Sequence, residues 1–93
     1  MNAKLFKDLE ALDFSETWKV KRVLQNIAND INYLKEVGSK RQLSHMIAAI
    51  EYFISINRPR YSQSLSSLPL EEKRFIIELL GMRDVANNIV GKK

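Results

Sequence analysis

The chain has a single histidine, and its surroundings decide whether the sequence supports an enzymatic reaction. His45 lies one helical turn after Arg41, and such a pair can in principle bind and protonate a phosphoryl group. A solvent-exposed histidine beside an arginine explains the same pattern without a ligand. The sequence has no glycine-rich phosphate loop, no metal-ligand spacing, and no neighbouring nucleophile and base. We therefore expect a protein that is not an enzyme and that uses no cofactor, metal or small-molecule substrate.

A stripe of unusual composition runs along the second predicted helix, on the side away from its apolar seam. Its members fall within about 40° of one line at about 100° per residue. Trp, Tyr and Arg are enriched anchors of protein interfaces, whereas aromatic rings also stack on unpaired bases and amides read base edges. We expect a binding surface here unless the first or the last helix covers it. The members are Trp18, Arg22, Asn26, Asn29 and Tyr33.

Basic residues gather toward one end of the predicted bundle. In an antiparallel hairpin that turns near Gly38, Trp18 faces the region of Arg58 and Pro59. No acid occurs between residues 16 and 30 or between 51 and 71. Arginines after a helix also stabilise the negative end of its dipole, so a purely structural explanation stands beside an anion-binding one. The residues of this basic-aromatic end are Trp18, Lys19, Lys21, Arg22, Arg58, Arg60 and Tyr61.

Two classes of function follow from these features. The leading hypothesis is a small regulatory binding protein that engages an anionic partner, preferably nucleic acid, through the basic-aromatic end. The alternative is a protein-interaction module, such as an adaptor, inhibitor or immunity-type protein. Its partner would be an acidic protein or a second copy bound at the outer face of the second helix. A helix-turn-helix is less favoured, because the long matched seams indicate near-antiparallel neighbours rather than a steep crossing.

Composition places these surfaces on one ordinary domain, residues 1–93. The chain is 45% hydrophobic and 28% charged, has no cysteine, and carries a modest net charge of +4. The beginning of the chain lacks an apolar signal-peptide core. The longest apolar stretch, 46–56, is interrupted by Glu51 and is too short to span a bilayer. We expect a cytoplasmic protein that does not contact a membrane.

Apolar periodicity and end signals predict the helices that position these residues. Steps of four and three residues along Val20–Leu34 and again along Leu43–Ile54 indicate two long amphipathic helices. The predicted fold is all-α: a small four- to five-helix up-down bundle around a central antiparallel hairpin of these two long helices. The expected helices are 3–12, a second ending at Val37, a third ending near Asn57, 69–80, and 82–90.

Capping residues set the expected ends of these helices. Asn2 suits the first N-cap, Asp13 or Ser15 the second, and Ser39 the third, with Gln42 completing a capping-box pattern. Gly38 suits the left-handed residue after the second helix. Residues 58–68 form an expected serine-rich loop, and Pro69 is expected at the first position of the fourth helix. Glu71 and Glu72 suit its positive end, and Gly81 is expected to end it.

Overall fold

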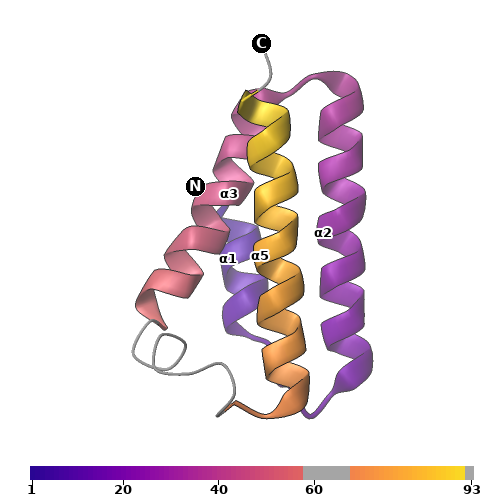
Figure 1. Cartoon of the computed structure of the whole chain (residues 1–93), viewed down its shortest axis with the longest axis vertical. Helices are drawn as coiled ribbons and strands as arrows, with labels where there is room; N and C mark the ends of the chain where they lie inside the picture. Colours follow the sequence, from indigo (N-terminus) through magenta and orange to yellow (C-terminus); the bar gives the residue numbers. More distant parts are fainter. Residues whose placement is uncertain (58–67, 92–93) are drawn as a thin grey trace.

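A computed structural model describes residues 1–57 and 68–91, and every regular element within these ranges is an α-helix (Figure 1). The all-α prediction is confirmed for this part of the chain, which forms a small helical bundle. The expected loop, apart from Leu68, lies outside the described residues. The helices are α1 (Ala3–Glu10), α2 (Thr17–Val37), α3 (Lys40–Ile56) and α5 (Leu70–Gly91).

Three of the predicted helix ends are found where the sequence indicates them. The Asn2 side chain accepts a hydrogen bond from the Leu5 amide at 3.0 Å and caps α1. Gly38 follows α2 with φ +73°, the left-handed conformation that glycine adopts without steric cost. The Ser39 hydroxyl accepts from the Gln42 amide at 3.4 Å at the start of α3. Short polar residues and one glycine thus set these boundaries.

The predicted cap of the second helix is wrong. The Asp13 carboxylate accepts from both the amide and the hydroxyl of Ser15, at 2.9 and 2.7 Å. These bonds close the turn between α1 and α2, so α2 begins later, at Thr17, with Glu16 as a cap residue that makes no side-chain bond. α1 likewise ends at Glu10, two residues before the predicted end, and Leu12 turns back to bond the Leu9 carbonyl at 3.3 Å.

The predicted break at Gly81 is also wrong, because one helix, α5, runs without interruption through this position to Gly91. Its buried side continues across the glycine, from Phe75 and Leu79 to Ala86. Glycine in a helix costs about 1 kcal/mol relative to alanine. Burial of apolar residues on both sides of Gly81 outweighs that cost. Pro69 immediately precedes α5 instead of occupying its first position.

The core is built mainly from α2, α3 and α5. α3 packs against α1, α2 and α5, and α5 also packs against α2. The finer arrangement expected from the sequence, an up-down bundle around a central hairpin, stays a prediction. Side chains buried almost completely come from every helix: Leu9, Ile27, Leu43, Ile50, Phe75, Ile76 and Leu79.

The two ends of the bundle differ in the elements that meet there. Figure 1 shows the beginning of α2, the end of α3 and the beginning of α5 at one end. The turn between α2 and α3 and the end of α5 lie at the other end. None of the described helices is both long and apolar enough to cross a membrane.

Candidate functional site

The outer stripe of α2 is open to solvent. Trp18 is 60% exposed and Tyr33 is 63% exposed, and the three polar members between them are exposed as well. α1 packs mainly against α3, α5 packs against α2 and α3, and neither covers the two rings. Burial of Trp18 and Tyr33 by the first or last helix is therefore not observed. The stripe consists of Trp18, Arg22, Asn26, Asn29 and Tyr33, and we call it the α2 outer face.

Trp18 has a charged neighbour that is itself neutralised. The Lys19 Nζ atom lies 5.4 Å from the centre of the Trp18 ring and 2.8 Å from Glu16 Oε2. A cation over an exposed ring contributes about 0.5–1 kcal/mol, and the exposed ion pair adds little more. The ion pair reduces the positive charge that Lys19 offers to a phosphate. Glu16 directly precedes α2 and the basic residues Lys19, Lys21 and Arg22. Its carboxylate reaches forward by one turn and pairs with Lys19.

A second acid reaches this end from α5. The Thr17 hydroxyl donates to Glu71 Oε1 at 3.1 Å, which places that carboxylate at the start of α2. Its neighbour Glu72 is only 1% exposed, because it lies one turn before Phe75 and Ile76 on the buried side of α5. The sequence predicts a basic end with few acids nearby. In the structure, two acids lie at the beginning of α2: Glu16, which pairs with Lys19, and Glu71, which accepts from Thr17.

The described part of the molecule carries no net formal side-chain charge. All eleven acidic residues and eleven of the fifteen basic residues lie within 1–57 and 68–91. The excess of +4 therefore belongs to residues outside the described ranges: Arg58, Arg60, Lys92 and Lys93. Of the predicted site residues, Arg58, Arg60 and Tyr61 lie outside the described residues.

Lys21 lies on a different flank from Arg22. It lines a shallow hollow between α2 and α5, together with Gln25 of α2 and Glu78 of α5. Arg22 is exposed on the α2 outer face itself. The predicted cations of α2 therefore diverge around the helix instead of forming one patch.

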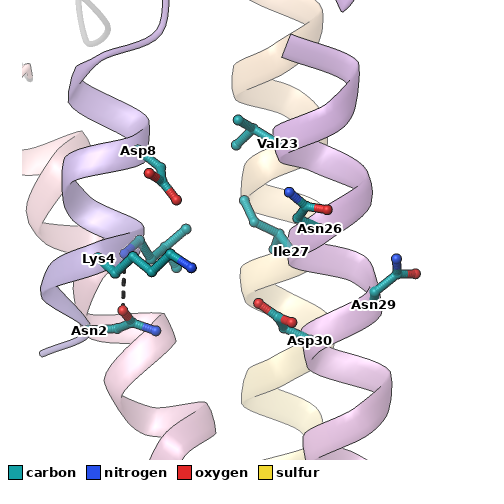
Figure 2. Close-up of a pocket in the computed structure, with 9 residues that line it drawn as sticks. Asn2, Lys4, Asp8, Val23, Asn26, Ile27, Asn29 and Asp30 are labelled. Atoms are coloured by element: carbon teal, nitrogen blue, oxygen red, sulfur yellow. Dashed lines mark hydrogen bonds between the residues drawn. The ribbon is translucent and has the colours of Figure 1, made fainter. Parts of the chain in front are cut away.

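A polar groove borders the α2 outer face, between α1 and α2 (Figure 2). Its volume is about 280 Å³, and apolar side chains of Val23 and Ile27 line it on the α2 side. Asp8 stands on the α1 wall and Asp30 on the α2 wall, and the Lys4 side chain extends from α1 toward α2. The remaining polar residues of the groove are Asn2, Asn26 and Asn29.

A second hollow, of about 350 Å³, shares Asn2 and Asp30 with this groove and continues along α2. Tyr33 lines it, and His45 contributes from α3. The backbone carbonyl of His45 accepts a hydrogen bond from the Asn2 amide at 3.1 Å, which ties the beginning of α1 to α3. Together the two hollows form a depression along one side of the α2 outer face. Helical spacing alone could not reveal it, because its other walls come from α1 and α3.

The side chains of the α2 outer face are of types that make stacking contacts and hydrogen bonds. No group of three or more His, Asp or Glu side chains within residues 1–57 and 68–91 could hold a metal ion. The α2 outer face offers two rings, a guanidinium group and two amides, with a hydrogen bond from Gln25 to Asn29 at 3.0 Å orienting one amide. These groups bind flat or hydrogen-bonding surfaces.

No protein-family model, curated protein or solved structure matches the chain. The exposed chemistry of α2 is thus the basis for assigning a function.

Proposed function

We propose that this protein is a non-enzymatic interaction module that docks onto a partner protein through the α2 outer face. The observation that carries the proposal is the exposure of Trp18 and Tyr33 on one side of one helix. Large rings exposed in this way gain free energy when a partner covers them, at about 25 cal/mol per Å² of apolar surface. Arg22 between them completes the set of residue types that most often anchor protein interfaces.

Two features favour a protein over nucleic acid as the partner. First, the described residues carry no net charge, so they supply no overall attraction to a phosphate backbone. Second, Asp30 and Asp8 line the groove beside the α2 outer face, where a phosphate backbone would be repelled. A protein surface with hydrogen-bonding groups and a basic side chain suits the same groove. The asparagines there can bond to peptide groups of such a partner.

Nucleic acid is the second candidate, and one observation favours it. Lys19 and Arg22 are exposed next to Trp18, and in the sequence Arg58 and Arg60 come shortly after Asn57, the cap residue of α3. This candidate depends on the up-down arrangement expected from the sequence, with α2 and α3 as a hairpin. The contact between α2 and α3, and the position of the α2 beginning and the α3 end at the same end of the bundle in Figure 1, support that arrangement.

The protein-docking proposal is tested by capture with matched variants. Wild-type protein, a Trp18→Ala/Tyr33→Ala variant and a Tyr52→Ala/Ile56→Ala control are each immobilised and exposed to nuclease-treated lysate of the source cells. The control removes exposed apolar side chains from α3 instead of α2. We expect a protein that wild type and control retain and that the α2 variant loses. Equal retention by all three would reject the α2 outer face as the docking surface.

The nucleic-acid candidate is tested by titration of the Trp18 emission with single-stranded and duplex DNA at low and high salt. Binding that disappears at high salt and is weakened in an Arg22→Ala variant would support nucleic acid in place of a partner protein. An emission that does not change at either salt concentration would exclude nucleic acid as the partner.

A homodimer through α2 would be detected by sedimentation. It predicts that the Trp18→Ala/Tyr33→Ala variant sediments with a lower mass than the wild type, whereas the α3 control does not.

A further inference from the structure

Asp30 lies where the two hollows beside the α2 outer face meet, since it lines both of them. Its side chain is exposed, and no cation of the described residues forms an ion pair with it. An exposed carboxylate on a flat surface needs no partner beyond water. Asp30 differs, because it belongs to a depression that also contains an aromatic ring and apolar surface. Its position points to a ligand with positive charge.

The formal charge of this depression is negative. In the second hollow Asp30 is the only lining residue with a formal charge, with His45 counted as neutral. In the adjoining groove Asp8 stands on the α1 wall, Asp30 on the α2 wall, and Lys4 is the only lining cation (Figure 2). Two carboxylates and one ammonium group leave one negative charge over the two hollows together. Lys4 forms no ion pair with either acid, so both carboxylates are available to a cation from outside.

The second hollow also has the surfaces that suit the rest of an arginine side chain. Tyr33 follows Asp30 by three residues on α2, so the ring and the carboxylate are neighbours on one side of the helix. The ring is 63% exposed. The buried side chains of Leu34 and Met46 add apolar surface to the lining. A guanidinium group can stack on a ring and donate two parallel hydrogen bonds to a carboxylate, while its aliphatic stem packs on apolar surface.

We propose that the second hollow is an arginine pocket, in which Asp30 and Tyr33 hold one arginine side chain of the partner protein. The proposal rests on the docking proposed for the α2 outer face and adds what the partner presents there. A volume of about 350 Å³ admits one long side chain. Lysine fits less well, because its ammonium group is a compact, strongly hydrated charge that cannot pair with a carboxylate through two parallel bonds. The same carboxylate repels a phosphate group.

Titration of the full chain with N-acetylarginine N-methylamide tests the pocket without the partner. Two-dimensional NMR of isotope-labelled protein follows the backbone amide signals. The citrulline derivative is the matched control, since it keeps the shape of arginine and lacks its charge. We expect the arginine derivative to shift the signals around Asp30, Tyr33 and His45 with a dissociation constant in the millimolar range, and the citrulline derivative to shift them little.

Variants of the two proposed contacts test the role of each group. Asp30→Asn is expected to raise the dissociation constant of the arginine derivative about threefold. Glu36→Gln removes one charge from exposed α2 surface outside the hollows and should leave that constant unchanged. Tyr33→Leu removes the ring and should weaken binding, whereas Tyr33→Phe keeps the ring and should not. Far-UV circular dichroism checks that each variant is folded.

Several outcomes would overturn the arginine pocket. They are equal shifts from the arginine and citrulline derivatives, a lysine derivative that binds as tightly as arginine, and Asp30→Asn binding like Glu36→Gln. The capture experiment separates this proposal from the docking on which it rests. If Trp18→Ala/Tyr33→Ala lost the partner and Asp30→Asn retained it fully, the docking would stand and the arginine pocket would be wrong. Equal capture by every variant would reject the docking as well.

Discussion

The hydroxyl of Thr17 donates a hydrogen bond to the carboxylate of Glu71, 3.1 Å from Oε1 and 3.3 Å from Oε2. The two residues are 54 positions apart in the chain, and the bond joins the beginning of α2 to the first turn of α5. The same carboxylate lies at the positive end of the α5 dipole. One acid thus stabilises a helix end and fixes the distance between two helices next to Trp18.

Thr17→Val removes this donor and keeps the shape of the side chain. Because the bond is exposed, we expect the free energy of unfolding to fall by about 0.5–1 kcal/mol, measured by urea denaturation. A double-mutant cycle with Glu71→Gln gives the coupling between the two side chains. A cycle with no coupling would mean that the bond does not stabilise the protein in solution.

Replacement of two glycines by alanine is predicted to change the stability of the protein in opposite directions. Gly81 lies inside α5 with free space around it, so Gly81→Ala should stabilise the protein by about 0.5–1 kcal/mol. Gly38 has φ +73°, and Gly38→Ala should destabilise it by about 1 kcal/mol, since a Cβ atom is unfavourable in that conformation. Thermal unfolding of both variants measures the signs. A destabilising Gly81→Ala would indicate that the helix is broken there after all.

The pKa of Asp13 is predicted to lie below the ordinary value of an aspartate. The Ser15 hydroxyl, and then the Ser15 backbone N–H, hold the pKa of Asp13 below its ordinary value. Because the folded-state pKa is the lower one, this stabilisation is present above the unfolded-state pKa. It is lost as the pH falls through the folded-state pKa. Ser15→Ala should raise the pKa of Asp13 toward its ordinary value, as followed by NMR of the carboxyl carbon. Ser44→Ala, on exposed α3 surface, is the control and should leave the titration unchanged.

Trp18 is the only tryptophan, so its fluorescence reports directly on the α2 outer face. At 60% exposure we expect an emission maximum close to that of tryptophan in water and efficient quenching by acrylamide. Addition of the cognate partner should shift the emission to the blue and protect it from quenching. A blue-shifted, protected emission in the isolated monomer would show that Trp18 is covered, and the docking proposal would fail.

The helices α2 and α3 were predictable from local information alone. Val20, Leu24, Ile27, Ile31 and Leu34 repeat at helical spacing, and all five are buried. Asn2, Gly38 and Ser39 act through bonds or dihedral angles within a few residues, so their effects are visible in sequence. The position of the α2 outer face away from the buried seam also followed from helical geometry, whereas its exposure depended on whether another helix covers it.

The mistaken cap of α2 arises from local bonds between Asp13 and Ser15, but the other errors concern interactions between distant residues. Gly81 ends a helix by local preference, but burial on both sides of it by α2 and α3 decides otherwise. The approach of Glu71 to Thr17 and the burial of Glu72 depend on where α5 packs. The polar groove needs α1 opposite Asn26 and Asp30, and the short α1 sequence does not indicate which neighbour it contacts. Spacing along the chain contains none of this information.

The distribution of charge determines what ion-exchange chromatography and isoelectric focusing will report. The sequence isoelectric point of about 9.5 results from the four cations outside the described ranges, since the helices and their described connections balance. A variant with Arg58 and Arg60 replaced by Gln, and Lys92 and Lys93 likewise, should therefore focus near neutral pH with every described contact retained. Retention of the natural protein on a cation exchanger should therefore depend mainly on Arg58, Arg60, Lys92 and Lys93, and little on the helices.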